Sequence, residues 1–108
     1  MTTRARIAVP DAVPAGEPFE IKTLITHPME TGFRRDAMGQ AIPRNIITRF
    51  ECRFSGRTLF TASLNTGIAA NPFLSFFVRL EQSGTLEFLW TGQNDFAHRE
   101  TRDVQVTS

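Results

Sequence analysis

Apolar and polar residues alternate with a period of two along most of this chain, which is the pattern of half-buried β-strands. In the segment Asn45–Phe54, Phe50 and Phe54 fall on one face, whereas Arg49 and Glu51 fall on the other. Residues typical of turns separate such segments roughly every 8–12 positions, and no segment has the spacing of a useful amphipathic helix. We therefore predict an all-β protein, built as a β-sandwich or a small barrel.

The predicted strands are about seven in number, and most are joined by short turns. The segment between Pro10 and Pro18 is rich in proline and is predicted to be a connection. The strands are expected at Arg6–Pro10, Phe19–Thr26, Asn45–Phe54, Arg57–Leu64, Phe73–Leu80, Thr85–Thr91 and Phe96–Ser108.

The dipeptide Ser55–Gly56 predicts a tight turn between two of these strands. With a two-residue turn, Cys52 would face Leu59, and Phe60 would share a face with Glu51. A slip of one residue would place Phe60 on the face of Cys52 instead. Either register leaves apolar side chains on a face that also carries charges.

Two predicted strands are apolar on both faces, which an antiparallel sheet with one face in water would not show. In one of them, Phe73 and Phe77 project opposite to Phe76, and in the other Leu89 projects opposite to Trp90. The second face is covered either by the chain itself or by another protein, since large exposed apolar patches usually mark interaction sites.

Composition limits the classes of partner. The 108 residues fit one domain, 1–108, and the net charge of +1 argues against nucleic acid or an anionic membrane as the main partner. No apolar segment approaches the roughly 20 residues of a membrane span, and the first residues lack the apolar core of a signal peptide. We expect a soluble protein that is not exported by a signal of its own.

Residues that could support catalysis or bind a metal are sparse. His27 and His98 lie far apart, and the sequence has neither a CxxC pair nor a phosphate-binding glycine motif. Cys52 alternates with Phe50 and Phe54, so we expect a buried thiol rather than a nucleophile. We predict no metal site and no cofactor, and we expect His27 to hydrogen-bond the loop that it opens.

The segment His27–Asn45 is long for a connection in a compact domain, and such connections are usually functional or disordered. It contains Phe33 and Met38, which a disordered linker would not favour. The part Met29–Ile42 could cover the second apolar face of the sheet or the open end of the sandwich. Alternatively, the segment is an ordered recognition element.

Three stretches of sequence resemble the SoxZ family, which supplies the smaller subunit of the thiosulfate-oxidation carrier complex. They are "HPMETGFRRD" with "IPRNII" between His27 and Ile47, "GIAANPFLSFFV" from Gly67 to Val78, and a blurred terminal pattern around Trp90–Asp95. The resemblance covers nearly the whole chain. It implies an immunoglobulin-like β-sandwich that pairs with a second subunit, SoxY.

The resemblance also implies different roles for the two subunits. SoxY-like subunits end in a flexible glycine-rich arm whose cysteine carries the sulfur substrate, and other enzymes of the Sox pathway act on it. This sequence ends in "DVQVTS" without such an arm, so we expect the non-catalytic scaffold half of a heterodimer or of a higher assembly. The resemblance places it in the periplasm, exported with a partner that bears a twin-arginine signal.

Two groups of residues are the predicted contacts. Phe73, Phe77 and Leu89 are expected at the partner interface. We expect the loop residues near the docking path of the partner's arm or of pathway enzymes, with the two arginines attracting an anionic sulfonate. These loop residues are His27, Met29, Phe33, Arg34 and Arg35.

Two alternatives remain open at the level of sequence. One is a free-standing binding module, which the single Trp and the absence of Tyr disfavour. The other is a small redox protein that uses Cys52, or an iron-binding immunoglobulin-like reductase, for which the chain has few histidines. A thiol enzyme requires that Cys52 react with an alkylating agent in the native protein.

Overall fold

The computed structural model describes residues 4–68 and 70–107, which form eight β-strands. This confirms the predicted all-β class and the sandwich architecture. The strands are β1 (Ala5–Ala8), β2 (Ala12–Pro14), β3 (Phe19–Ile25), β4 (Ile47–Phe54), β5 (Arg57–Ser63), β6 (Phe73–Val78), β7 (Gly84–Gly92) and β8 (Ala97–Thr107). Ser108, at the end of the last predicted strand, and Ala69, in the second matched stretch, lie outside the described residues.

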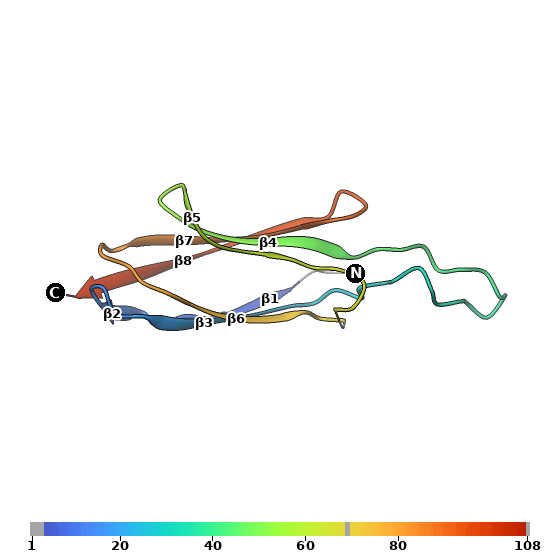
Figure 1. Cartoon of the computed structure of the whole chain (residues 1–108), viewed down its shortest axis with the longest axis horizontal. Helices are drawn as coiled ribbons and strands as arrows, with labels where there is room; N and C mark the ends of the chain where they lie inside the picture. The colour runs from blue at the N-terminus through green and yellow to red at the C-terminus, as the bar shows by residue number, and fades with distance from the viewer. Residues whose placement is uncertain (1–3, 69, 108) are drawn as a thin grey trace.

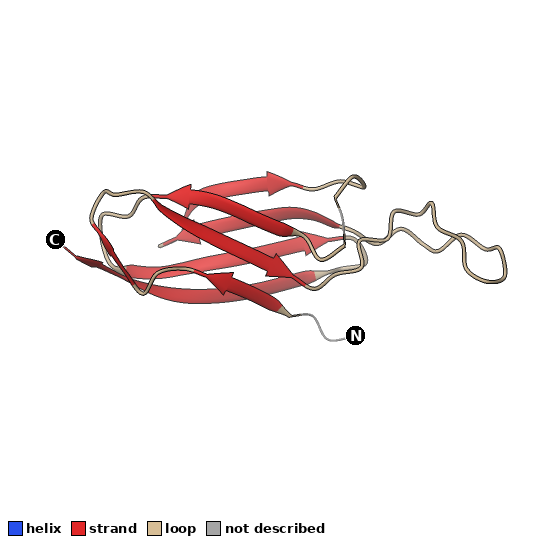
Figure 2. Cartoon of the chain, turned by 90° about the horizontal axis from the view of Figure 1, so that it is seen from below, coloured by secondary structure: helices blue, strands red, loops and turns tan. Residues whose placement is uncertain are grey.

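Two sheets pack face to face (Figure 1). The smaller sheet has the order β1-β3-β6, and the larger has the order β2-β8-β7-β4-β5. Figure 2 views the molecule from the side of the smaller sheet, in which β3 lies between β1 and β6. Neighbouring strands are antiparallel except for β2, which runs parallel to β8. Each sheet therefore ends in two edge strands, a property that bears on association.

Strand β2 was not predicted, because it lies within the proline-rich segment that we interpreted as a connection. It is only three residues long and contributes one buried side chain, Val13. Its Pro14 lies at the end of an edge strand, where the missing N–H costs no ladder bond. A strand this short leaves almost no periodic signal.

The core is aromatic and lies between the inner faces of the two sheets. Phe50, Phe88 and Trp90 are at most 1% exposed, and the Phe50 and Trp90 rings are 5.1 Å apart between centroids. As predicted, Phe76 points inward and the neighbouring Phe77 points outward. Rings at such offset and tilted geometries add to the stabilisation from area burial alone.

The predicted pairing of Cys52 with Leu59 is wrong. The two-residue turn at Ser55 forms as expected, but a bulge between Cys52 and Arg53 shifts the register. Cys52 therefore faces Phe60, whose ring stacks on Phe76 at 4.2 Å between centroids. The bulge adds one residue to β5 and so moves an aromatic side chain from the charged face into the core.

The segment after β3 gives the molecule its elongated shape. The principal dimensions are 61 × 21 × 20 Å, and the radius of gyration is 16.3 Å, against roughly 13 Å for a compact chain of this length. Residues 27–45 form a long irregular hairpin that projects from one end of the sandwich (Figure 1). The interpretation that Met29–Ile42 folds back over the second face of the sheet is therefore wrong.

Candidate protein-interaction site

The base of the long hairpin is fixed to the loop that precedes β6. The His27 backbone N–H donates to Asn71 Oδ1 at 2.9 Å, and the Asn71 N–H donates to the His27 carbonyl at 2.7 Å. Next to this contact, at the end of β3, the Ile25 N–H donates to the Pro72 carbonyl at 3.2 Å. His27 belongs to the first stretch that resembles the SoxZ family, and Asn71 belongs to the second. These two stretches therefore meet in space.

The side chains of His27 and Met29 are buried at this base, where the two residues are 3% and 4% exposed. The His27 ring accepts a hydrogen bond at Nδ1 from the Met29 N–H at 3.0 Å, as the sequence predicted for a histidine that opens a loop. Met29 Sδ in turn accepts from the Ile47 N–H at 3.2 Å. Burial lowers the pKa of His27 because desolvation disfavours the charged ring. The predicted loop residues His27 and Met29 thus anchor the hairpin from inside.

A third segment, the turn after β7, completes the base. The Gln93 N–H donates to the Ile46 carbonyl at 3.0 Å, and Gln93 Oε1 accepts from the Ile46 N–H at 3.2 Å. The Phe96 ring meets the His27 ring edge-on, with 4.8 Å between centroids. Sequence analysis missed Asn71, Gln93 and Phe96 as anchors. Their only visible signals were an Asn before a proline and the blurred pattern near the end of the chain.

Beyond its base, the hairpin holds its shape with its own hydrogen bonds. The Glu30 and Asn45 backbones exchange hydrogen bonds of 2.8 and 2.7 Å. Near the tip, Asp36 Oδ1 accepts from the Met38 N–H at 2.9 Å. Phe33 and Met38 are 84% and 85% exposed. The hairpin therefore presents two large apolar side chains on a backbone that is already ordered.

The two arginines of the hairpin have partners within the chain. Arg34 pairs with Glu30, with 2.5 Å between Nη2 and Oε1, and this hydrogen bond lowers the pKa of Glu30. Arg35 Nη1 donates to the Gly39 carbonyl at 2.8 Å. Arg34 thus pairs with a carboxylate, whereas the partner of Arg35 is an uncharged carbonyl. The predicted attraction of a sulfonate consequently depends on Arg35 more than on Arg34.

A second apolar surface lies on the outer side of the three-stranded sheet. Phe73 and Phe77 project from β6 and are 58% and 66% exposed. Leu24 of β3 faces Phe73 across the strands, and the two side chains line a hollow of about 290 Å³ beside Arg6. We call the outward-facing residues Phe73, Ser75 and Phe77 the β6 face. It begins one residue after Pro72, so it adjoins the base of the hairpin.

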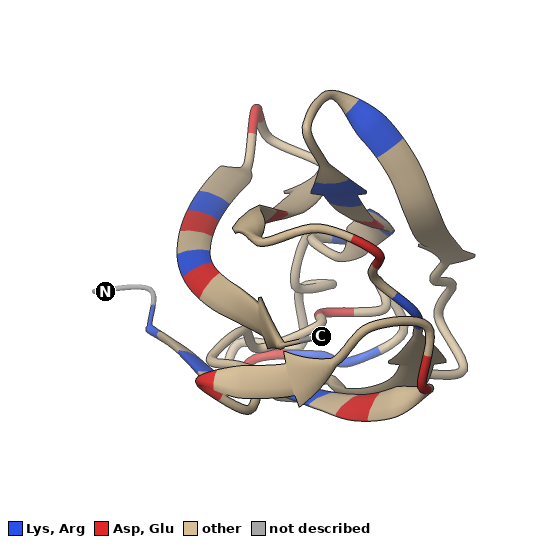
Figure 3. Ribbon diagram, turned by 90° about the vertical axis from the view of Figure 1, so that its left-hand side faces the viewer, with Lys and Arg blue, Asp and Glu red and all other residues tan. Residues whose placement is uncertain are grey.

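Leu89 is not part of this surface. It lies on the outer side of the five-stranded sheet, where its cross-strand neighbours are Glu51 and Arg99. That side is a mosaic of charges: Glu51 pairs with Arg53 at 3.0 Å, and Arg99 pairs with Glu87. Figure 3 shows opposite charges alternating along β8, the strand that leads to the C-terminus. Phe73 and Phe77 thus share the outer face of β6 on either side of Ser75, and Leu89 lies on the outer side of the other sheet.

The thiol is remote from solvent. Cys52 is 0% exposed, and desolvation by burial raises its pKa to about 12. His98, on β8, pairs with Glu100 at 2.8 Å. Within residues 4–68 and 70–107, no three His, Cys, Asp or Glu side chains are placed to share a metal ion.

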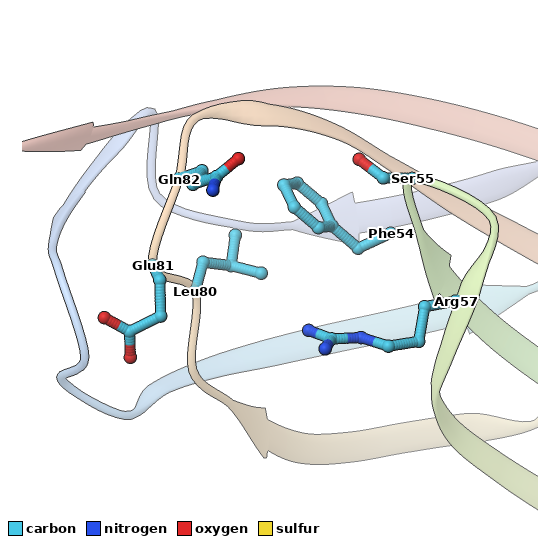
Figure 4. A pocket seen from close by; sticks show the side chains of 6 residues that line it. All are labelled: Phe54, Ser55, Arg57, Leu80, Glu81 and Gln82. Atoms are coloured by element: carbon cyan, nitrogen blue, oxygen red, sulfur yellow. The ribbon is translucent and has the colours of Figure 1, made fainter.

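One hollow at the end opposite the hairpin offers polar groups. It has a volume of about 350 Å³, and Figure 4 shows Arg57 of β5 pointing toward Leu80 and Glu81. Phe54, Ser55 and Gln82 complete its lining. Its polar lining thus consists of an arginine, a carboxylate, an amide and the Ser55 hydroxyl.

Comparison with known proteins identifies the family. The profile described as "Sulphur oxidation protein SoxZ" matches residues 7–103. The chain belongs to the SoxZ family. This membership gives it a role in sulfur oxidation and confirms the resemblance drawn from the loop motifs. The comparison with curated proteins gives no significant match.

Solved structures share the fold at low sequence identity. The superoxide reductase (neelaredoxin) of Ignicoccus hospitalis is 19% identical with a TM-score of 0.72, and the alignment covers 95% of this chain and 80% of the reductase. A putative superoxide reductase of Thermotoga maritima is 16% identical with a TM-score of 0.69, covering 96% and 86% respectively. Such likeness establishes the fold alone.

In the described part of this SoxZ-family chain, the two histidines and the thiol lie apart from one another. Its two histidines, His27 and His98, are engaged with the Met29 backbone and with Glu100, and Cys52 is inside the core. The described part of the chain also holds no helix that could cross a bilayer. The large exposed apolar side chains of the described residues lie on the β6 face, at Leu24 beside it and on the hairpin.

Proposed function

We propose that this chain is the non-catalytic scaffold subunit of a SoxYZ-type carrier complex in thiosulfate oxidation. It pairs with a SoxY-like subunit whose terminal cysteine carries the sulfur substrate. The β6 face forms part of the interface with that subunit. The observation that carries this proposal is the pair Phe73 and Phe77, two large apolar side chains exposed on the same face of an edge strand.

The exposure of these two rings is costly in water. At about 25 cal/mol per Å², covering roughly 120 Å² on each ring would contribute about 6 kcal/mol over both, before the losses of association. Obligate interfaces are apolar in this way because they resemble a domain core cut in half. The polar, charge-paired outer side of the five-stranded sheet, including Leu89, lacks that character.

The hairpin has a separate role in this proposal. It extends well beyond the sandwich, and its exposed Phe33 and Met38 offer anchors for transient contacts with the partner's arm or with other Sox enzymes. Arg35 supplies a cation for an oxyanion at the end of the carried group. We place the complex in the periplasm, exported with a partner that carries the twin-arginine signal.

The experiment is co-purification of the SoxY-like subunit with a tagged form of this chain. Phe77→Asp puts a charge in the proposed apolar interface, and we expect at least a tenfold loss of recovered partner. Ala97→Asp, on an exposed position of the opposite sheet, is the matched control and should retain it. Full retention by Phe77→Asp, with a circular dichroism spectrum unchanged from wild type, would refute the interface.

A small thiol-dependent redox protein is the weaker alternative. Burial and a pKa near 12 keep the Cys52 sulfur protonated and inaccessible at neutral pH. A free-standing binding module would use the same exposed rings. It is distinguished by the co-purification experiment, because such a module would ignore a SoxY-like subunit.

A further inference from the structure

Strand β6 is an edge strand that carries no protective residue of its own, although β5 approaches it where Phe60 stacks on Phe76 and where Leu59 lines a hollow with Phe77. Soluble proteins blunt their sheet edges with charges, prolines or bulges, since a bare edge offers unpaired N–H and C=O groups to another strand. Among the described edge strands, β1 carries Arg6, β2 ends in Pro14 and β5 begins with Arg57. The sequence of β6, FLSFFV, has no charge and no proline.

The backbone groups that face the free edge follow from the pairing with β3. The Ile25 N–H bonds to the Pro72 carbonyl, so this is a hydrogen-bonded pair of the antiparallel ladder. Such pairs recur at every second residue, which turns the N–H and C=O of Leu74 and Phe76 toward β3. The same groups of Phe73, Ser75 and Phe77 therefore point away from the sheet, into the free edge.

These outward groups are self-complementary. We propose that the free chain forms a twofold dimer in which β6 pairs antiparallel with β6 of a second copy, with Ser75 opposite Ser75 on the axis. In this register Phe73 faces Phe77 of the second copy, and Phe77 faces its Phe73. All three pairs are hydrogen-bonded pairs that use the outward N–H and C=O groups.

The side chains and charges fit this register. Directly opposed residues lie on the same face, so four phenylalanine rings form two cross-strand aromatic pairs on the outer side. No like charges meet, because β6 carries none. Lys22, next to Ser75 on β3, is paired with Glu20 at 3.7 Å, and Glu20 also accepts from Ser75 Oγ at 2.6 Å. The interface therefore lacks the repulsion that an isologous contact between charged edges would create.

The exposed phenylalanine surface that the dimer can cover limits its strength. At about 200 Å² per ring, exposures of 58% and 66% leave on the order of 250 Å² of phenylalanine surface per chain. Two copies bring on the order of 500 Å² together, below the roughly 1,200 Å² that specific stable complexes bury. The dimer is consequently weak and concentration-dependent, and a partner with a larger complementary surface would displace it.

This inference concerns the chain alone and goes beyond the proposed pairing with a SoxY-like subunit. The two associations compete for the β6 face. Failure of one does not imply failure of the other, since self-association is measured without any partner present.

The first experiment is the mass in solution of the purified chain across a concentration series, measured by sedimentation or light scattering. We expect a shift from 12.1 kDa toward twice that value as concentration rises. Ser75→Pro removes the outward N–H on the axis without removing a backbone bond to β3, and proline is tolerated on that side of an edge strand. It also removes the exposed Ser75 Oγ bond to Glu20, which Ser75→Cys removes as well. It should hold the chain at the monomer mass, whereas Ser75→Thr, which keeps the N–H, should behave as wild type.

A second experiment tests the register and does not depend on the proline variant. In Ser75→Cys the two thiols lie opposite each other, so a short bis-maleimide should link the copies. In Lys22→Cys on β3, three strand spacings, or about 14 Å, separate the two thiols, and the same reagent should not reach. The native Cys52 is buried and does not compete.

The proposal is overturned by a wild-type chain that stays at 12.1 kDa at every concentration. Dimer formation by a folded Ser75→Pro variant equal to that of wild type would also overturn it. So would cross-linking of Lys22→Cys as efficient as that of Ser75→Cys. If the wild-type chain stays a monomer, the free edge of β6 would be available to a strand of another protein.

Discussion

The substitution Asn71→Ala tests how the hairpin is attached to the sandwich. Asn71 joins the two matched stretches, because its Oδ1 accepts from the His27 N–H and its own N–H donates to the His27 carbonyl. Its backbone is left-handed, with φ of 54°, a conformation that Asn tolerates and Ala does not favour. The variant therefore loses a hydrogen-bond acceptor and strains a backbone in one step.

The two losses have known sizes. Leaving the His27 N–H without its acceptor costs about 1–3 kcal/mol, and an alanine in the left-handed region costs about 1 kcal/mol more than asparagine. The free energy of unfolding should fall by about 2–4 kcal/mol. For 108 residues the entropy of unfolding is about 0.23 kcal/mol/K, so the melting temperature should fall by about 9–18 °C.

Thermal melts followed by circular dichroism would measure this, with two further variants at Asn71 that separate the causes. Asn71→Gly removes only the acceptor, because glycine accepts a positive φ, and it should be about 1 kcal/mol milder than alanine. Asn71→Asp keeps both the acceptor and the turn preference, and it should remain within about 1 kcal/mol of wild type. An alanine variant that melts within 2–3 °C of wild type would refute the proposed anchoring.

Three further outcomes are expected. Cys52 should resist iodoacetamide in the native protein at pH 8 and react after unfolding in urea. Rapid labelling of the native protein would instead support the hypothesis of a thiol-dependent redox protein. Gly92→Ala places a Cβ 2.4 Å from the Ile46 carbonyl oxygen, so it should cost about 2 kcal/mol or more, whereas Gly67→Ala, which meets only a flexible side-chain oxygen, should cost under about 1 kcal/mol. Because burial lowers the pKa of His27, the unfolded chain takes up a proton first, and stability falls as the pH drops below about 6.5, by up to about 1.4 kcal/mol at pH 5.5. His27→Asn should flatten that step in urea unfolding, and an equally steep step in this variant would exclude His27 as its cause.

Much of the sandwich was predictable because its strands alternate and end at turn residues. The inward Phe76 and Trp90 and the outward Phe73 and Phe77 follow from period-two counting once a strand is located. The burial of Cys52 follows from the same count. Such assignments need only local sequence, since each side of a strand is fixed by the parity of the residue number.

The parts that could not be predicted depend on contacts between distant segments. The bulge after Cys52 is stabilised by the stacking of Phe60 on Phe76, which belongs to another sheet. The anchoring of the hairpin depends on Asn71 and Gln93, which lie far along the chain from His27. Nothing in the spacing of these residues indicates that they meet, so the sequence left open whether the loop covers the sandwich or forms an ordered recognition element.

The two exposed apolar features differ in a way that separates their proposed roles. The β6 face leaves strand hydrogen-bonding groups open, so its occupant must supply a matching strand edge as well as an apolar surface. The hairpin satisfies its own backbone through pairs such as Glu30 with Asn45, and it pairs Arg34 with Glu30. It can therefore hold Phe33 and Met38 in place without a partner, and binding there requires no ordering of the chain. The open strand edge favours permanent pairing at β6, and the preformed projecting hairpin favours exchangeable contacts. A scaffold that serves several enzymes in turn would require both.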